Sequence, residues 1–181
     1  MKIEIVRSDE FTDEEVEEIK ATFPKDISIK DFYSIRQSEF PPPLLMIVIK
    51  FAAFGVGAGL FNKIGSDIWD KLKEKIIPII LKERGSGRTD FRIELHSEEF
   101  TFKFFIEEIN EENLAKALST ISDGINQVLV AINNNEFPFK RGHVDIFFDK
   151  SKWEFADAID FDSFRRYKFN RGTKSWDKLG R

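Results

Sequence analysis

The sequence predicts a single α+β domain, in which an antiparallel or mixed sheet packs against a long Gly-containing apolar helix and a second amphipathic helix. Three observations support this fold class. Residues 91–104 alternate apolar and polar side chains in two runs around a short polar segment, which is typical of a β-hairpin. Residues 111–133 carry apolar side chains at steps of three and four, which indicates an amphipathic helix. Residues 41–84 are apolar in their first half and amphipathic in their second half.

The chain of 181 residues is long enough for one domain with a substantial core, and two full domains are not expected. We divide it into a strand–helix–strand lead-in (1–40), a long central helix (41–84), a region of hairpin, helix and C-terminal strands (85–160) and a basic aromatic tail (161–181). The 20 phenylalanines, against 2 tyrosines, are enough to fill a core between a sheet and its helices.

The lead-in is expected to contain two strands, at residues 2–6 and about 27–35, with a helix between them. The helix begins at a capping box made by Thr12 and Glu15, in which each side chain bonds the backbone N–H of the other residue. Pro24 ends the helix. In the C-terminal third, alternating apolar residues predict a strand at 144–148 and a partner strand that contains Trp153 and Phe155. The last twenty residues show no clear period.

The apolar run at residues 44–61 can be a core helix or a membrane-inserting segment. Gly55 and Gly59 have the spacing that lets membrane helices approach closely, and a span needs about 20 apolar residues. Against a span, Lys50 near the middle costs about 2.5–3.5 kcal/mol on insertion scales. The strands on both sides also need a common sheet. A buried helix or an oligomer interface is therefore favoured, and insertion into or attachment to a membrane through residues 44–61 is the alternative.

The second half of this segment continues as an apolar stripe that includes Ile64 and Ile68, and Pro78 is expected to kink or end the helix near Glu74. A one-sided stripe suits the rim of a core or a membrane surface. We expect the following residues of the segment to take part in self-association: Lys50, Gly55, Gly57, Gly59, Ile64, Ile68 and Trp69.

The tail differs in charge from the rest of the chain. From residue 163 onward, seven basic residues against Asp177 give a net charge of +6. The formal net charge of the whole chain is −4, so the residues before 163 carry −10. Basic residues interleaved with aromatic ones can contact a protein partner, anionic lipid or a nucleic acid. The acidic body argues against nucleic acid as the main partner. The alternative is that the aromatic rings pack on the domain itself. The predicted contact residues of the tail are Arg165, Arg166, Tyr167, Lys168, Arg171 and Trp176.

Composition excludes several kinds of site. The chain has no cysteine, so disulfides, zinc ribbons and thiol nucleophiles are absent. The two histidines, His96 and His143, are too few for a multi-histidine metal site and are expected to be surface or capping residues. We see no secretory signal at the N-terminus and expect a cytoplasmic protein, or one that faces the cytosol from a membrane.

Two clusters of aspartates are candidates for catalytic or metal-binding sites. Asp157, Asp160 and Asp162 are more simply explained as turn and cap residues than as ligands of a cation. Asp145 and Asp149, with Lys152 nearby, loosely suggest the carboxylates and lysine of a metal-dependent nuclease. The glycines from Gly55 to Gly59 lack the third small residue of a dinucleotide-binding loop. We therefore predict no catalytic residue, no cofactor and no metal ligand, and leave a nuclease-like enzyme as a second alternative.

The order of elements resembles one known family over roughly residues 1–130. The segments KIEIV, TDEEVEEIKATF, the apolar Gly/Ala run that ends in IWDKLKEK, and FRIELHSEEFTFKF are similar in layout to the effector-associated constant component of bacterial conflict systems. This resemblance implies a non-catalytic adaptor or regulator of an effector and transfers no catalytic residue. We accordingly expect a non-enzymatic interaction module that self-associates.

Overall fold

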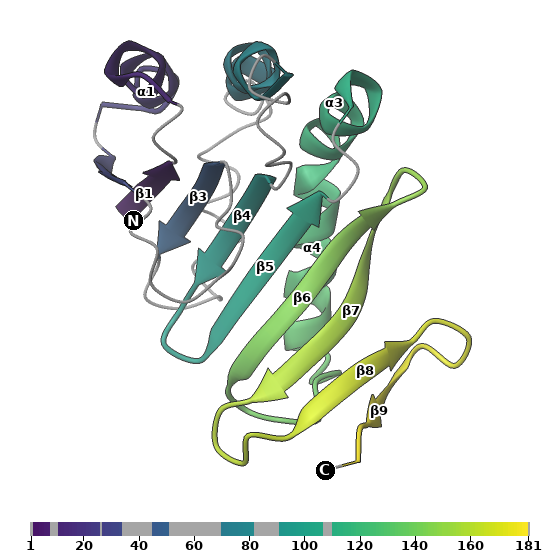
Figure 1. Ribbon diagram of the computed structural model, residues 1–181. Coiled ribbons are helices and arrows are strands. Elements are labelled where there is room, and N and C mark those ends of the chain that lie inside the picture. The colour runs from purple at the N-terminus through teal and green to yellow at the C-terminus, as the bar shows by residue number, and fades with distance from the viewer. Residues whose placement is uncertain are drawn as a thin grey trace.

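The protein has one mixed sheet of nine strands, with helices packed on it (Figure 1). The structure, a computed structural model, describes residues 2–7, 11–25, 27–33, 45–50, 70–81, 91–106 and 110–180. The strands are β1 (Lys2–Arg7), β2 (Ser28–Tyr33), β3 (Leu45–Lys50), β4 (Phe91–His96), β5 (Phe100–Ile106), β6 (Gly142–Asp149), β7 (Lys152–Asp160), β8 (Arg166–Asn170) and β9 (Ser175–Lys178). The helices are α1 (Asp13–Lys20), the helix 70–81, α3 (Glu111–Ser119) and α4 (Ile121–Asn133). The predicted α+β class and mixed sheet are confirmed.

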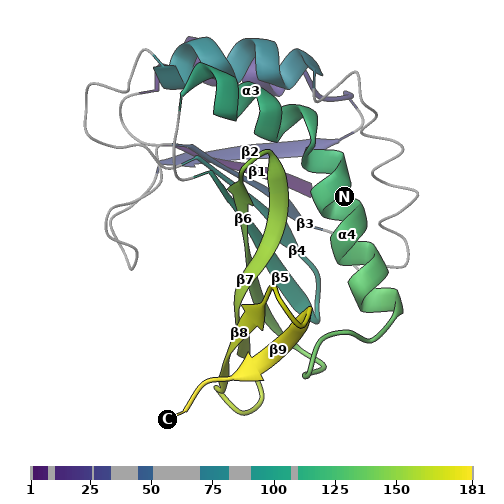
Figure 2. The same cartoon turned by 90° about the vertical axis from the view of Figure 1, so that its right-hand side faces the viewer.

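The strand order in the sheet is β2-β1-β3-β4-β5-β6-β7-β8-β9. The pairs β1–β2, β3–β4 and β5–β6 are parallel, and in each case a helix lies between the two strands in the chain. Parallel neighbours need such a long connection, whereas antiparallel neighbours can be joined by a short turn. The last four strands, β6 to β9, form an antiparallel meander. Figure 2 shows how strongly the sheet twists between β2 and β9.

The two faces of the sheet differ in character. The helix 70–81, α3 and α4 lie on one side, which we call the helix face (Figure 2). In β5 the side chains of Phe100, Phe102 and Phe104 are buried on the helix face, while Thr101 and Lys103 are partly exposed on the other side, the outer face. Apolar residues from every described helix and from most strands form one core on the helix face.

Local sequence signals place the first helix against the sheet. The predicted capping box is present: the backbone N–H of Glu15 donates to Thr12 Oγ1 at 3.2 Å, and that of Thr12 donates to Glu15 Oε2 at 2.9 Å. Arg7 at the end of β1 is buried, and its Nη1 donates to the carbonyl of Phe11 at 2.7 Å. The same guanidinium pairs with Asp13 in the first turn of α1. These contacts tie β1 to the start of α1.

The prediction of one long helix over residues 41–84 is wrong at Leu45–Lys50, which form β3. This strand lies between β1 and β4, and Leu45, Ile47 and Val48 are buried. A strand buried on both faces reads as a continuous apolar run, and its length and periodicity do not separate it from a buried helix segment. Lys50, the last residue of β3, pairs with Glu4 of β1 at 2.7 Å.

The amphipathic half of this segment is helical at 70–81, and Leu72, Ile76 and Ile80 of its apolar stripe are buried. Pro78 was predicted to kink or end the helix; it lies inside the helix, so the end near Glu74 is wrong. The other residues predicted to mediate self-association here fall outside the described residues: Gly55, Gly57, Gly59, Ile64, Ile68 and Trp69.

One further prediction needs correction. The single helix over 111–133 is broken at Thr120 into α3 and α4, and the Thr120 hydroxyl donates to the carbonyl of Lys116 at 2.9 Å. Such a bond competes with the helical pattern and favours an end or a bend.

The tail, whose sequence shows no clear period, contains two strands. Residues 166–178 form the hairpin β8–β9 at the edge of the sheet.

Candidate interaction site

A groove with a volume of about 600 Å³ lies between α4 and the C-terminal strands on the helix face. Its base is aromatic and is formed by Trp153, Phe155 and Phe169. One side is the flank of α4, with Gly124 and Val130. Ligand pockets in proteins commonly have volumes of about 300–1,000 Å³ and mainly apolar linings with a few polar groups. The groove has the size and the chemistry of a binding site.

Aromatic packing holds the C-terminal hairpin in place beside the groove. The ring of Phe155 lies 5.4 Å from that of Phe169 in an edge-to-face arrangement and 5.8 Å from the ring system of Trp176. Tyr167 is buried and lies 5.6 Å from Phe139. Pairs of this geometry contribute about 0.5–1.5 kcal/mol each beyond the burial of their area. The hairpin is therefore an integral part of the sheet, and its aromatic side chains are anchors rather than free contact residues.

The close approach of α4 to β7 requires a glycine at position 124. A Cβ atom built on Gly124 would lie 2.7 Å from Cγ of Trp153, 2.9 Å from its Cδ1 and 3.0 Å from Cε1 of Phe104. Trp153 in turn lies against Phe104, with a ring distance of 5.3 Å. The position of Trp153 in the base of the groove thus depends on the missing side chain at Gly124.

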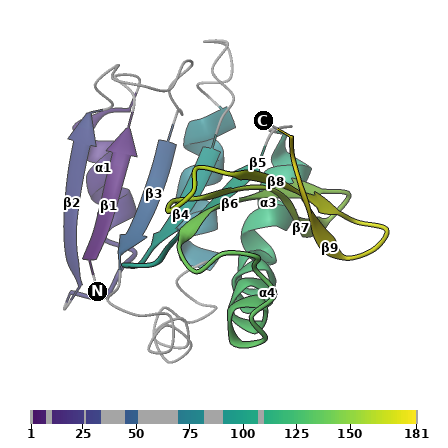
Figure 3. The ribbon, with the colours of Figure 1, turned by 90° about the horizontal axis from the view of Figure 1, so that it is seen from below.

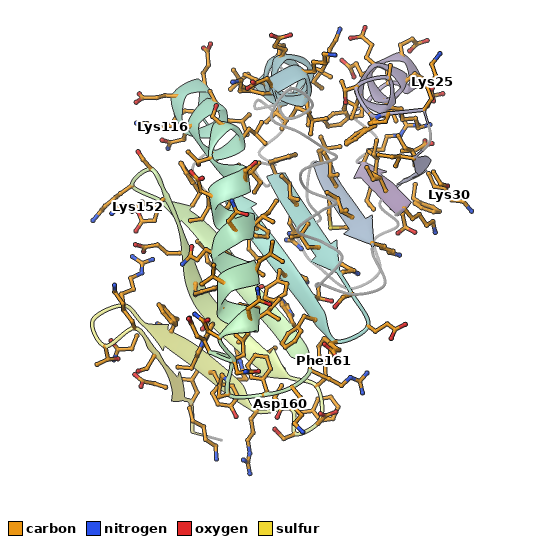
Figure 4. All side chains as sticks on the ribbon, turned by 180° about the vertical axis from the view of Figure 1, so that it is seen from behind. Lys25, Lys30, Lys116, Lys152, Asp160 and Phe161 are labelled. Carbon is orange, nitrogen blue, oxygen red and sulfur yellow. The ribbon has the colours of Figure 1, made fainter. Side chains whose placement is uncertain are left out.

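The rims of the groove carry charges of both signs. The α4 side has Asp123 and, just after the helix, Glu136, whereas Lys152 and Lys174 lie on the strand side. Arg171 is already engaged, because its Nη1 lies 3.0 Å from Asp149 Oδ2 and its Nε lies 2.7 Å from Glu154 Oε2. Figure 4 looks onto α4 and shows Lys152 at the turn beside it.

Val130 is the most exposed apolar residue of α4, with 55% of its surface accessible. It lies off the apolar seam of this helix and faces the groove instead of the core. An exposed apolar side chain on the flank of an aromatic groove extends the surface on which a partner can pack.

A second unusual feature is the turn between β7 and β8, which we call the Phe turn (residues 161–164). Its two aromatic side chains point to solvent: Phe161 is 41% exposed and Phe164 is 82% exposed. Phe164 has φ of 54°, in the left-handed region that bulky residues rarely adopt. Figure 4 shows Phe161 at the end of the sheet farthest from Lys25 and Lys116.

Asp160 fixes the shape of the Phe turn. Its Oδ1 accepts a hydrogen bond from the backbone N–H of Asp162 at 2.9 Å, and its Oδ2 accepts one from the Ser163 hydroxyl. The Ser163 hydrogen bond is the main reason that the pKa of Asp160 lies below its ordinary value. The prediction of Asp160 as a turn residue is confirmed. The turn therefore presents its two phenylalanines from an ordered backbone.

The predicted contact residues of the tail divide into two groups. Tyr167 and Trp176 point into the aromatic cluster, as in the alternative in which the rings pack on the domain. Arg165, Arg166 and Lys168 are exposed, and Arg165 and Arg166 directly follow the Phe turn. Of the predicted residues that the structure describes, Arg171 alone lines the groove, and Lys50 lies on β3, away from it.

The sequence analysis did not predict several residues of this site. The sequence does indicate that Val130 and Phe164 are exposed, because Val130 lies off the apolar seam of its helix and Phe164 fits no strand period. The contact of Trp153 with Gly124 joins positions 29 residues apart and depends on how α4 crosses β7. Sequence periodicity does not report such a crossing.

The described residues provide no metal centre and no spanning helix. Within them, no group of three or more histidine, cysteine, aspartate and glutamate side chains is placed to hold a metal ion. Asp145 pairs with His143 and Asp149 pairs with Arg171, so the two candidate nuclease carboxylates belong to different clusters. No helix in the described part of the chain is long and apolar enough to cross a membrane.

Comparisons with protein-family models, with curated proteins and with solved structures gave no match for this chain. The resemblance to the effector-associated constant component of bacterial conflict systems therefore stays a prediction.

Proposed function

We propose that the protein is a non-enzymatic interaction module that self-associates, with the Phe turn of one copy docked in the groove of another copy. The observation that carries this proposal is the pairing of two features on one chain: an ordered turn with an 82% exposed Phe164, and an aromatic groove large enough to receive it. An adaptor role, as the family resemblance implies, would use the same contact. We place the module in the cytosol, where a chain without cysteine needs no oxidising environment.

Charge complementarity supports a second copy as the occupant of the groove. Arg165 and Arg166 directly follow the Phe turn, and Asp123 and Glu136 lie on the α4 rim of the groove. A Phe turn docked with its arginines toward α4 would bring opposite charges together. Pairs at such a rim steer association and fix register more than they add affinity.

The size of the contact predicts a weak association. Burial of each phenylalanine contributes about 1.5–3 kcal/mol. Loss of translational and rotational freedom opposes binding by an estimated 4–15 kcal/mol. Two phenylalanines contribute at most about 6 kcal/mol, which alone would correspond to a dissociation constant of about 40 µM. With the opposing loss of freedom, we expect a dissociation constant in the upper micromolar range or weaker, even with the rim charges. We expect monomers in dilute solution and dimers or larger assemblies at high protein concentration.

Sedimentation velocity over a range of about 1 to 500 µM tests the proposal. The expected result is a rise in the weight-average sedimentation coefficient with concentration, which Phe164→Asn abolishes. Asparagine removes the ring and accepts the left-handed backbone at this position. Phe32→Asn is the matched control, because Phe32 is 45% exposed but lies on β2 at the other edge of the sheet.

Two results would overturn the proposal. One is a wild-type protein that stays monomeric over the whole range, and the other is an association that Phe32→Asn reduces as much as Phe164→Asn does. Flotation with anionic vesicles tests the membrane alternative, since exposed phenylalanines beside arginines can also bind a lipid surface. A monomeric protein that binds vesicles through Phe164 would assign the Phe turn to lipid and not to a second copy.

A further inference from the structure

Both histidines of the chain lie on the outer face of the sheet, in one row with Thr101 between them. In the register of the sheet, His96 of β4 is opposite Thr101 of β5, and Thr101 is opposite His143 of β6. In the neighbouring row, Lys103 of β5 lies in the same way between two carboxylates, Glu94 of β4 and Asp145 of β6. Figure 3 shows these strands side by side from the end of the sheet at which the histidines lie. The two histidines of the chain therefore lie on either side of the Thr101 hydroxyl group.

Each imidazole is held by a carboxylate of its own strand. His96 Nε2 lies 2.6 Å from Glu94 Oε2, and His143 Nε2 lies 2.5 Å from Asp145 Oδ1. The side chains of His96 and His143 are 31% and 20% exposed, so solvent reaches both rings. In the described part of the chain, neither Nδ1 atom has a hydrogen-bond partner. The carboxylates orient the rings and leave one nitrogen of each ring for a ligand.

The surroundings keep Glu94 ionised. Burial alone would raise its pKa, but the hydrogen bond from His96 and the charges of Lys103 and Arg92 outweigh burial, and the pKa lies below the ordinary value. Lys103 Nζ and Arg92 Nη1 lie 3.7 and 3.8 Å from Glu94 Oε1. The ionised Glu94 is therefore held by His96, Lys103 and Arg92 together.

The charged and titratable groups that face this row come from seven strands. They are Lys2 and Glu4 of β1, Lys50 of β3, Arg92 and Glu94 of β4, Lys103 of β5, Asp145 of β6, Asp157 of β7, and Arg166 and Lys168 of β8. Beside His143, β7 places the apolar side chain of Ile159.

We propose that His96, Thr101 and His143 form a binding site for the phosphate group of a small molecule. Neighbouring strands are about 4.8 Å apart. The backbone positions of His96 and His143, two strands apart, are therefore about 10 Å apart, and the two residues flank Thr101. One phosphate with a hydrogen bond of about 2.8 Å on either side fills such a gap. When both rings are protonated, the site offers two charged N–H donors and one hydroxyl donor, with Lys50 next to His96.

The same row favours a single phosphate over a long polyanion. Beyond His96, the cations Lys50 and Lys2 both pair with Glu4, at 2.7 Å each. Glu94 and Asp145 lie directly behind the imidazoles and would repel a strand of phosphates that crossed them. On the other side, the apolar Ile159 separates His143 from the exposed Arg166 of β8, so the two imidazoles act together only at the gap over Thr101.

The test is NMR of the two imidazoles in the full-length protein, since two ring Cε1–H signals are expected and His96→Gln assigns them. Sodium phosphate is added at pH 5.5 and at pH 8.5, with sodium chloride at matched ionic strength as the control. We expect both signals to move together and to saturate with one midpoint, and binding to weaken at least tenfold at pH 8.5, where imidazoles are ordinarily neutral. Shifts that chloride reproduces, or two unrelated midpoints, would overturn the proposal.

Variants test each donor separately. Glutamine at His96 keeps an N–H for Glu94 and loses the second donor, so His96→Gln should weaken phosphate binding about tenfold. Thr101→Val should weaken it several-fold, and Lys116→Gln on α3, which removes one charge on the helix face, should leave it unchanged. Equal effects of Thr101→Val and Lys116→Gln would contradict the assignment of the hydroxyl.

Two further ligands separate a small phosphate from nucleic acid. A nucleoside monophosphate, whose phosphate is not bridged to a second nucleotide, should bind more tightly than a single-stranded oligonucleotide at the same concentration. An oligonucleotide that binds more tightly would show a polyanion site and overturn the assignment. The site lies on the face opposite to the groove, so this result is independent of self-association.

Discussion

A glycine-to-alanine substitution at position 124 should destabilise the protein, although the same change in an ordinary helix is stabilising. The new Cβ would lie 2.7 Å from Cγ of Trp153, which is close to the base of that side chain. Trp153 has little room to retreat, because it packs against Phe104 at 5.3 Å and Phe148 at 5.2 Å. Either the indole or α4 has to move.

The expected magnitude follows from two opposing terms. Overpacking a well-filled core costs about 1–3 kcal/mol. Alanine in place of glycine favours the helix by about 0.8–1.0 kcal/mol. The net result for Gly124→Ala is a loss of about 1 kcal/mol in the free energy of unfolding, which corresponds to a fall of about 2–4 °C in Tm for a chain of this size.

Urea unfolding followed by circular dichroism measures this difference. Asn126→Ala is the matched control, since Asn126 is exposed on the same helix and its replacement should stabilise by no more than about 0.7 kcal/mol. If Gly124→Ala raised the free energy of unfolding by about 1 kcal/mol, α4 would not approach β7 as closely as the structure shows, and the groove would have a different base.

Three other predictions concern single residues. Thr12→Ala should lower the free energy of unfolding by about 1 kcal/mol, as measured by urea unfolding, because it removes the cap of α1. Phe164→Asn should raise the same quantity by about 0.5 kcal/mol, since asparagine tolerates φ of 54°, and a loss of stability would contradict this reading of the Phe turn. The pKa of Glu94 is lower in the folded protein than its unfolded value of about 4.3, so its stabilisation is complete above that pH and is lost as the pH falls through the folded pKa. Unfolding midpoints measured from pH 6 to about pH 3 should therefore fall less in His96→Ala, which removes the hydrogen bond to Glu94, than in wild type; equal slopes would count against the His96–Glu94 pair.

The parts of the fold that could be predicted from the sequence are those with one buried and one polar face. In β4 and β5 the alternation around residues 97–99 gave the hairpin, and Thr12 with Glu15 located the start of α1. The strand β3 was mistaken for helix because Val48, on the outer face, is also buried. Its neighbours in the sheet come from distant parts of the chain, so no local pattern identifies it.

The candidate sites were harder to predict, because each combines residues from separate elements. Phe169 and Trp153 meet at the groove only after β7 and β8 pair and α4 crosses them. His96 and His143 appeared to be isolated surface residues. The i, i+2 spacing to Glu94 and Asp145 was visible in the sequence, but the pairing of β4, β5 and β6 was needed to place the two histidines in one row.

Self-association through the Phe turn and the groove can be tested most directly by mixing two defective variants. Phe164→Asn removes the turn and keeps the groove, whereas Val130→Glu places a charge on the flank of the groove and keeps the turn. Ser122→Glu, at an exposed position of α4 away from the groove lining, is the control for the added charge. We predict that each variant alone sediments as a monomer and that their mixture regains association, since one copy supplies an intact turn and the other an intact groove. A mixture that stays monomeric while Ser122→Glu associates like wild type would contradict the proposed contact.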